Sequence, residues 1–330
     1  MMRAPNYWRH DGPAARLLMP LAWGYGLLAT ARRGLTRPER AACPVICVGN
    51  LVAGGAGKTP VALDLGRRLI EAGRRVHFLS RGYGGAAAGP LRVDPGRHDA
   101  WDVGDEPLLL ATTAPTWVAR NRPQGARAAV GAGAEVIVMD DGFQNPSLIK
   151  DLSLVVVDGE YGFGNGRLMP AGPLRESVAA GLGRADGLVV MGEGAAWRDG
   201  LAGFAKPILH GALEPAPESS ALAGRRVLAF AGIADPAKLF ATLDTMGCTL
   251  VSTHDFPDHH PYSADEIMTL VELAAAQGAV PVTTEKDHAR LPVEARTMVE
   301  ALRVHMAWRE PAALDGLLDC ILEGAAGGLA

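Results

Sequence analysis

A short run of small residues ends in a lysine and a threonine, Gly54-Gly55-Ala56-Gly57-Lys58-Thr59. Glycines let backbone N–H groups approach phosphate oxygens closely, and the N-terminus of a following helix adds positive charge. Lys58 would neutralise the β- and γ-phosphates of a nucleotide, and the Thr59 hydroxyl would ligate Mg²⁺. The strict motif begins with a glycine, whereas this chain has Val52 there. The run still predicts an ATP phosphate-binding loop rather than a glycine-rich turn followed by a chance Lys-Thr pair.

A second pattern is an apolar stretch that ends in two carboxylates, Asp140 and Asp141. By itself, Asp-Asp-Gly at the end of a strand is a common turn signal. Beside a phosphate-binding loop, such an aspartate holds Mg²⁺ directly or through water. Together the two patterns predict a nucleotide–magnesium site, with nucleotide hydrolysis or phosphoryl transfer as its chemistry.

The elements that position these residues follow a strand–helix alternation. Nearly all-apolar, β-branched runs separate longer amphipathic stretches, which is typical of βαβ units whose sheet is covered on both faces. A helix is expected over Thr59–Ala72, with Gly73 as its cap. The strands expected in the first half of the chain are Val45–Val48, Val76–Leu79, Thr116–Val118, Val136–Met139, Leu154–Val157 and Leu188–Met191.

The length of 330 residues favours two domains, at roughly 100–200 residues each. Gly211–Gly224 is rich in Pro, Ser, Ala and Gly and has the composition of a linker. We therefore expect a P-loop domain over residues 1–220 and a smaller α/β domain over 221–330. The elements expected in the second domain are Val227–Ala231, a helix over Pro236–Met246, Thr249–Ser252, a helix from the capping box Ser263/Glu266 to Gln277, Val280–Thr283, and a final strand–helix pair.

The amino-terminal segment is apolar and basic. Leu17–Ala31 lies between arginines, and residues 1–40 hold seven arginines against two acidic residues, although the whole chain has a net charge of −4. The run is shorter than the ~20 residues that span a bilayer. A signal peptide and a buried helix are alternatives, but a helix at about 13–33 on a membrane surface fits best, with Trp23 and Tyr25 at headgroup level. The overall charge gives no reason to expect nucleic-acid binding.

Eight short motifs occur in an order that resembles the tetraacyldisaccharide 4'-kinases of lipid A synthesis, and they cover nearly the whole chain. They are Gly49-Asn50 with the glycine-rich run, SRGYG at 80–84, VGDEP at 103–107, DDGFQ at 140–144, FGNG at 163–166, MPAGPLRE at 169–176, FPDH at 256–259 and TEKD at 284–287.

The resemblance implies a P-loop domain joined to a smaller α/β domain. It also implies an enzyme that moves the γ-phosphate of ATP, with Mg²⁺, to the 4' hydroxyl of a tetraacylated disaccharide 1-phosphate, forming lipid IVA. The partners would be the lipid-linked disaccharide and the cytoplasmic face of a bacterial inner membrane, with no nucleic acid and no obligate protein partner.

The resemblance also assigns roles to single residues. Asp105 matches the residue regarded as the base, and His259 matches the histidine that supports it. Lys58 and Thr59 match the phosphate-loop pair, and Asp140 with Asp141 the acidic strand end. The remaining matches are substrate contacts: Ser80, Arg81, Tyr83, Arg122, Asn165 and Glu176.

The residues themselves leave alternatives open. Asp105 is well placed to be a helix N-cap. His259 has the neighbours of a surface-loop histidine, and His260 follows it directly. Glu285 and Lys286 have the pattern of an exposed ion pair.

Two further functions compete with the lipid kinase. A soluble P-loop kinase for a nucleoside, sulfate ester or sugar would bury Leu17–Ala31 in its core. A membrane-associated ATPase switch would carry a lysine before its paired glycines, where this chain has Ala53. The chain also departs from the family at Asn145, where a histidine is usual.

Overall fold

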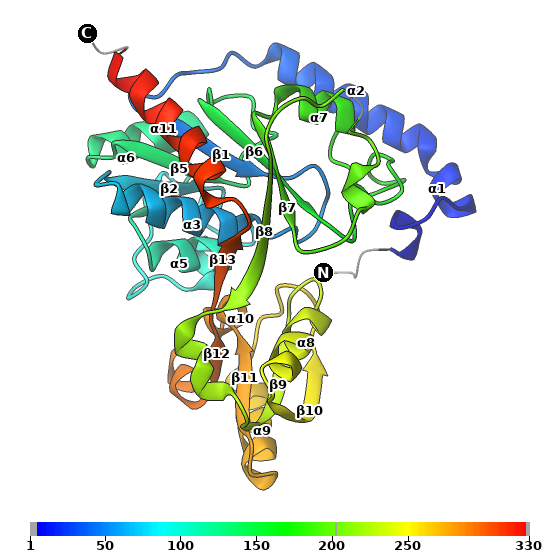
Figure 1. Ribbon diagram of the computed structural model, residues 1–330, viewed down its shortest axis with the longest axis vertical. Helices are drawn as coiled ribbons and strands as arrows, with labels where there is room; N and C mark the ends of the chain where they lie inside the picture. Colours follow the sequence, from blue (N-terminus) through cyan, green and yellow to red (C-terminus); the bar gives the residue numbers. More distant parts are fainter. Residues whose placement is uncertain (1–4, 202, 328–330) are drawn as a thin grey trace.

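The computed structural model describes residues 5–201 and 203–327, and its strands form two separate sheets (Figure 1). The larger sheet has nine strands in the order β13-β8-β7-β6-β1-β5-β2-β4-β3. Only the outer pairs β13–β8 and β3–β4 are antiparallel. The mostly parallel sheet expected from the sequence is therefore confirmed. Its strands are β1 (Val45–Gly49), β2 (Val76–Ser80), β3 (Leu91–Arg92), β4 (Thr116–Val118), β5 (Val136–Asp140), β6 (Leu152–Asp158), β7 (Gly187–Met191), β8 (Ile208–Pro215) and β13 (Val304–Trp308).

Alternate residues of each central strand pack into two different cores, because successive side chains point to opposite faces. On β1, Ile46 and Val48 join the core covered by α3 (Lys58–Glu71) and α11 (Pro311–Gly327). Val45 and Cys47 join the core on the other face, covered by α6 (Arg122–Gly131) and α7 (Val178–Arg184). Burial on both faces explains why these strands are almost wholly apolar.

The order of the strands brings the two chemical motifs together. β1 and β5 are parallel neighbours, and Val48 is in register with Asp140. Because both strands end at the same edge of the sheet, the loop that follows β1 and the acidic pair that ends β5 lie side by side. Two short helices, α4 (Ala100–Val103) and α5 (Asp105–Ala111), lie before β4 in the chain.

The smaller sheet has four parallel strands in the order β10-β9-β11-β12. The capping box of Ser263 and Glu266 opens its helix α9, as expected. The elements here are β9 (Arg226–Ala231), α8 (Ala237–Thr245), β10 (Thr249–Asp255), α9 (Ala264–Ala276), β11 (Val280–Thr284), α10 (Glu285–His288), η4 (Val293–Met298) and β12 (Glu300–Leu302).

Two expectations about chain organisation are wrong. The supposed linker Gly211–Gly224 contains the second half of β8, which pairs with β13, and a 3₁₀ turn, η3 (Pro217–Leu222). The final strand–helix pair does not complete the smaller sheet, since β13 pairs with β8 in the larger one and α11 packs there. The region 221–330 therefore divides between the two sheets. Composition favoured a linker, but pairing with distant strands decided the outcome.

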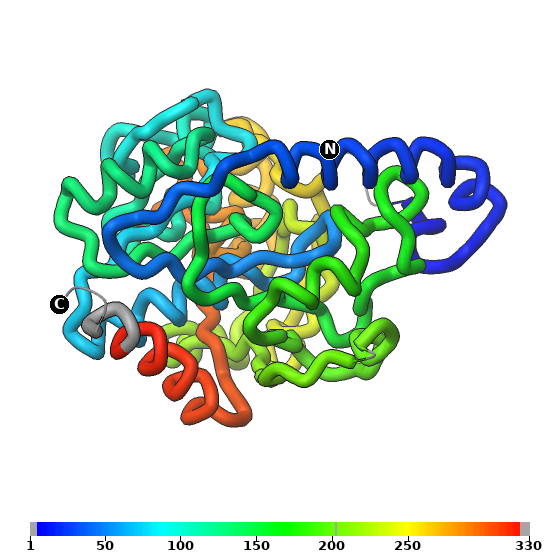
Figure 2. Tube along the Cα trace, turned by 90° about the horizontal axis from the view of Figure 1, so that it is seen from above, coloured from blue at the N-terminus to red at the C-terminus, as the bar shows by residue number. Residues whose placement is uncertain are grey.

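The amino-terminal segment forms α1 (Pro13–Leu17) and α2 (Met19–Leu35), preceded by η1 (Asn6–Trp8). Figure 2 shows α2 running along one side of the molecule, with α1 at its outer end. Leu17 is 81% exposed and Leu28 is 74% exposed, whereas the buried residues of the two helices are Ala15 and Ala22. The buried-helix alternative is therefore wrong. Arg3 of the basic segment lies outside the described residues.

Among residues 5–201 and 203–327, no helix has both the length and the apolar character needed to cross a membrane. One further 3₁₀ turn, η2 (Ala196–Arg198), follows β7.

Candidate active site

The glycine-rich run forms the loop between β1 and α3. Gly54 and Gly57 have φ values of +128° and +85°, which residues with a Cβ rarely adopt. Gly57 is the N-cap of α3, and no side chain of the described residues caps the first turn of this helix. The N–H groups of that first turn are therefore left for another acceptor, and an anion such as a phosphate is the acceptor that helix N-termini favour.

Lys58 and Asp141 lie together beside this loop. The Lys58 side chain is only 7% exposed, and its Nζ is 3.8 Å from Asp141 Oδ1. Arg175 donates to the same oxygen at 2.8 Å. Burial alone would raise the pKa of Asp141, but the charges of Lys58 and Arg175 outweigh it and lower the pKa. Asp141 also has a φ of +50°, an uncommon conformation for a non-glycine residue, which is typical of functional sites.

Asp140 and Thr59 are paired next to the same loop. The Thr59 hydroxyl donates to Asp140 Oδ2 at 3.0 Å. Asp140 Oδ1 is buried and has no hydrogen-bond partner among the described residues. Burial, with the nearby charge of Glu106, raises the pKa of Asp140 to about 7. A buried carboxylate oxygen without a partner, next to a threonine hydroxyl, has the hard oxygen donors that Mg²⁺ prefers.

Two more buried polar atoms near the loop lack partners within the described part of the chain, Asn50 Oδ1 and Arg122 Nε. Buried polar atoms normally find a partner, so unsatisfied atoms close to a phosphate-binding loop point to a ligand. Arg122 is 2% exposed, and it donates to the carbonyl of Ala119. Burial, with the charge of Arg81, lowers the pKa of Arg122 to about 10.

Asp105 and His259 pair across the two sheets. His259 Nδ1 lies 2.9 Å from Asp105 Oδ2, although 154 residues separate them in the sequence. Asp105 is 4% exposed, and it is the first residue of α5, whose N-cap is Gly104. The N-cap assignment for Asp105 is therefore wrong by one position. His260 pairs instead with Glu266, at 3.1 Å, so the histidine beside Asp105 is His259.

Two cations that the sequence interpretation did not assign complete the surroundings of Asp105. Lys286 Nζ is 3.6 Å and Arg290 Nε is 3.3 Å from Asp105 Oδ2. Burial alone would raise the pKa of Asp105, but the hydrogen bond with His259 and the two cations lower it well below its usual range. Lys286 is thus not half of an exposed pair with Glu285. Arg290 lies three residues after Asp287 of the TEKD motif. This spacing is the one sequence feature that could have indicated an ion pair between them.

The SRGYG motif at residues 80–84 begins at the end of β2 and approaches His259. Ser80 is buried at the end of β2, whereas Arg81 is exposed. Tyr83 is 53% exposed, and its ring is 5.9 Å from that of His259, edge to face. The motif thus contributes an aromatic side chain beside the Asp105–His259 pair.

Glu176 connects α2 to the phosphate loop. It is buried, and it accepts hydrogen bonds from Arg33 at 2.9 Å, Arg184 at 2.8 Å and Gln144 at 3.1 Å. Gln144 also donates to the carbonyl of Asn50 at 2.8 Å, directly before the loop. The end of the amino-terminal helix is therefore joined to the start of the glycine-rich loop through a single carboxylate and Gln144.

Asn165 has a different environment. It donates to the carbonyls of Tyr7 at 2.8 Å and Ala171 at 3.0 Å, and so supports the loop around it and the segment before α1. In residues 5–201 and 203–327, Asn165 forms no hydrogen bond with another of the predicted substrate residues. Its role in substrate binding stays a prediction.

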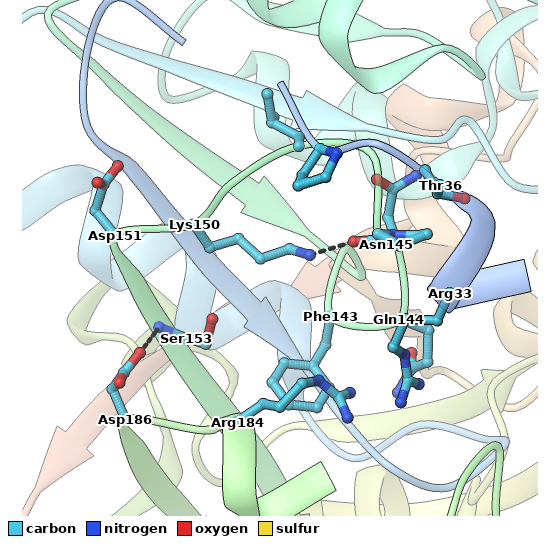
Figure 3. Close-up of a pocket in the computed structure, with 13 residues that line it drawn as sticks. Arg33, Thr36, Phe143, Gln144, Asn145, Lys150, Asp151, Ser153, Arg184 and Asp186 are labelled. Atoms are coloured by element: carbon cyan, nitrogen blue, oxygen red, sulfur yellow. Dashed lines mark hydrogen bonds between the residues drawn. The ribbon is translucent and has the colours of Figure 1, made fainter. Parts of the chain in front are cut away.

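A cavity of about 450 Å³ opens beside the Glu176 network (Figure 3). Arg33 and Thr36 reach it from the end of α2, Gln144 and Asn145 from the loop after β5, and Arg184 from α7. Asn145 Oδ1 accepts from the backbone and hydroxyl of Ser147, so the residue that replaces the usual histidine closes a turn here.

Comparisons with known proteins agree with this geometry. A family model described as tetraacyldisaccharide-1-P 4'-kinase matches residues 14–323. A tetraacyldisaccharide 4'-kinase of Rhodospirillum centenum is 56% identical over 329 residues, covering 98% of each chain. That of Paramagnetospirillum magneticum is 55% identical over 326 residues, covering 97% of this chain and 99% of its own.

Among solved structures, LpxK from Aquifex aeolicus, crystallised in complex with ATP, superposes with a TM-score of 0.75 at 28% identity. It covers 93% of this chain and 99% of its own. The match extends over both sheets, since it includes almost all of the chain. The chain therefore belongs to the tetraacyldisaccharide-1-P 4'-kinase family.

Proposed function

We propose that this chain transfers the γ-phosphate of ATP to the 4' hydroxyl of a tetraacyldisaccharide 1-phosphate, forming lipid IVA at the cytoplasmic face of a bacterial inner membrane. The observation that carries the proposal is the contact between Asp105 and His259, 2.9 Å apart, which joins the two domains. Glu106, next to Asp105, is near enough to raise the pKa of Asp140. This electrostatic effect supports a proton acceptor close to the nucleotide site.

The nucleotide's phosphates would bind the free N–H groups at the start of α3, with Lys58 supplying positive charge. Thr59 and Asp140 would hold Mg²⁺, with Asp141 beside them, because Asp140 Oδ1 is buried without a partner in the described part of the chain. Bound Mg²⁺ would offset the charge of the β- and γ-phosphates. Arg122, buried nearby, provides a further cation for an anionic ligand.

Asp105 would take the proton of the 4' hydroxyl. As the bond from the hydroxyl oxygen to the γ-phosphorus forms, the bond from that phosphorus to the β-phosphate oxygen breaks and ADP leaves. Phosphoryl transfer has a loose transition state that needs little prior deprotonation, so Asp105 would accept the proton late. His259 would fix the orientation of the carboxylate through Nδ1, with the tautomer assigned from that contact.

The amino-terminal helices supply a means of meeting a lipid. Leu21, Leu28 and Leu35 recur two helical turns apart, so they lie on one exposed face of α2. Arg32 and Arg33 occupy the last turn. An exposed apolar stripe with cations at its end is typical of a helix that lies in a membrane interface. The cavity at the inner end of this helix is a space where a sugar headgroup could enter.

The two alternative functions have less support. A soluble kinase of small metabolites would bury the apolar amino-terminal segment, yet Leu17 and Leu28 are largely exposed. An ATPase switch of the cell-division type needs a lysine before the paired glycines, where this chain has Ala53.

The proposal is tested by incubating the purified full chain with Mg²⁺, γ-labelled ATP and tetraacyldisaccharide 1-phosphate in mixed micelles. We expect label on the lipid, at a position shown by mass fragmentation to be 4'. The matched control is the same disaccharide with its 4' oxygen replaced by hydrogen, which should stay unlabelled. ATP hydrolysis without labelled lipid would contradict the proposal and favour an ATPase.

A further inference from the structure

Asp287 is a fully buried acid in the smaller domain. Its side chain is 0% exposed. One carboxylate oxygen accepts from the N–H of Gly232 at 3.0 Å and from the hydroxyl of Tyr262 at 2.9 Å, and the other accepts from Thr284 at 2.6 Å. A buried carboxylate with this many donors is held in one orientation.

Arg290 is the cation that Asp287 faces. Its side chain is 4% exposed, and its Nη2 lies 2.8 Å from Asp287 Oδ1. The same guanidinium donates to the carbonyl of Gly232 at 2.9 Å and to the carbonyl of His260 at 3.3 Å, and its Nε lies 3.3 Å from Asp105 Oδ2. Because the five N–H groups of arginine form a rigid planar fork, these contacts constrain one another.

Those carbonyls belong to the backbone that places His259. The carbonyl of Gly232 also accepts from the N–H of His259 at 3.0 Å, and His260 is the next residue. His259 has a φ of +59°, an unfavourable conformation for a residue with a Cβ, so its surroundings must impose it. Gly232 has no room for a side chain, because a Cβ there would lie 2.9 Å from the Tyr262 hydroxyl.

We propose that Asp287 and Arg290 are positioning residues for phosphoryl transfer. Asp287 orients Arg290, and Arg290 holds the loop that carries His259 against Asp105 of the other domain. The inference rests on the proposed role of Asp105 as proton acceptor, and it assigns to the TEKD motif a task that its sequence alone does not show. Within the described part of the chain, Arg290 contacts neither the phosphate loop nor the acidic strand end, so it acts through Asp105 and His259.

The test is a double-mutant cycle in the full chain with Arg290→Gln and Asp105→Asn, measured as lipid phosphorylation. Gln keeps most of the volume of Arg290 and can still donate to a carbonyl, but it lacks the charge and the fork. We expect Arg290→Gln alone to lower kcat on the order of 10²-fold, as a displaced catalytic group does, with the KM for ATP little changed. In the Asp105→Asn background the same change should lower kcat by less than about twofold.

Asp287→Asn should reproduce the defect of Arg290→Gln, and Arg290→Lys, which restores the charge without the fork, should recover only part of kcat. The matched control is Arg296→Gln. Arg296 also bonds backbone carbonyls of this region, those of Leu291 at 3.0 Å and Ala289 at 2.9 Å, but no contact joins it to Asp105. A purely structural role predicts equal losses for Arg290→Gln and Arg296→Gln, and equal losses in both backgrounds of the cycle; either result would overturn the inference.

Crystal structures of wild type and of Arg290→Gln test the inference without an activity measurement. If Arg290→Gln does not fold, Arg290→Lys takes its place. We expect the contact of His259 Nδ1 with Asp105 Oδ2 to be lost in the variant. If the 2.9 Å contact persists, the inference fails whatever the kinetics. If the wild type labels no lipid, the proposed function fails, while this distance still decides whether Arg290 positions the pair.

Discussion

The single residue that most needs explanation is Asp105, a buried acid whose charge is maintained by its neighbours. It contacts His259, Lys286 and Arg290, all of them from the smaller domain. Burying a charge is costly unless it is paired, so the three partners stabilise the ionised form of Asp105. Its chemistry is therefore set by residues more than 150 positions away in the chain.

The first prediction at this scale concerns Asp105→Asn. We expect kcat for lipid phosphorylation to fall by about 10²–10⁴-fold, because an amide cannot accept the hydroxyl proton. The control is Asp102→Asn, at a position three residues before Asp105. It weakens the capping box of α4 and should leave kcat nearly unchanged. A variant with lower melting temperature but normal kcat would mean that Asp105 serves folding alone.

The low pKa of Asp105 also predicts a pH dependence of stability. Because the folded-state pKa is lowered, the ionised carboxylate stabilises the fold above its unfolded pKa of about 3.9, and this stabilisation is lost as the pH falls below that value. The difference in free energy of unfolding between wild type and Asp105→Asn should thus be largest near neutral pH and shrink toward pH ~3. Urea unfolding of both proteins across this range measures it, and a constant difference would contradict the assigned pKa direction.

Lys58 provides the other prediction at the scale of a residue. Its buried ammonium faces the phosphate loop and Asp141, so Lys58→Ala should abolish measurable ATP turnover by removing charge from the β- and γ-phosphates. Lys206→Ala, which removes a half-exposed lysine paired with Asp186, is the control and should retain turnover. Near-normal turnover of Lys58→Ala in a coupled ADP assay would refute the loop assignment.

At the scale of elements, α2 differs from every helix that covers a sheet. Its leucines face outward, and its inner end is fixed by the ion pair of Arg33 with Glu176. Glu176 in turn contacts Gln144, which contacts the residue before the phosphate loop. An element of this kind can dock on a lipid surface while remaining in contact with the catalytic domain.

The corresponding prediction uses Leu21→Gln combined with Leu28→Gln. Burying each leucine in a membrane is worth about 1.5–3 kcal/mol, so the double variant should bind anionic vesicles at least about tenfold more weakly. Met268→Gln with Leu273→Gln, partly exposed residues of α9, is the matched control and should bind as wild type does. Cosedimentation measures the bound fraction. Equal binding of all three proteins would dismiss the membrane role of α2.

These substitutions are preferable to deletion of residues 1–33. A deletion would also remove Arg33 and the contact of Tyr7 with Asn165, and so would disturb the domain itself. Substitution of exposed leucines leaves those contacts in place, and a change in binding can then be attributed to the apolar stripe.

At the scale of the whole molecule, the chain leaves the larger sheet after β8 and returns to it at β13. The smaller sheet is therefore inserted between two antiparallel neighbours of the larger one, and Figure 1 shows it below the nine-stranded sheet. Ion pairs between the domains join Asp105 and Glu106 of α5 to Lys286 of α10, and Asp105 to Arg290, which follows α10. A second contact joins Lys238 of α8 to Asp158 at the end of β6.

This topology predicts that α11 stabilises the domain of the larger sheet. Leu314 is fully buried in the core that also holds α3, so Leu314→Ala should cost about 2–5 kcal/mol of unfolding free energy. Hydrogen exchange should rise in α3 and β8 but not in β9 or β11. The exposed Asp319→Ala on the same helix is the control. Faster exchange confined to β9 and β11 would show that α11 serves the smaller domain.

Most secondary structure could be predicted from the sequence, because local patterns specify it. The apolar runs of β1 and β5 predicted buried parallel strands, and Ser263 with Glu266 predicted the start of α9. Gly211–Gly224 misled the prediction because its composition is that of a loop, whereas pairing with β7 and β13 makes its first part a strand. Strand pairing depends on partners that lie far away in the sequence.

Patterns of neighbouring residues were enough to predict the glycine-rich loop, its acidic partners and the family resemblance. The contacts that appear only in the folded protein are those of Asp105 with His259 rather than His260, of Asp105 with Lys286 and Arg290, and of β13 with the larger sheet. The physical reason is the same in each case. These are contacts between segments far apart in the chain, and they exist only after two sheets have packed and brought their edges together.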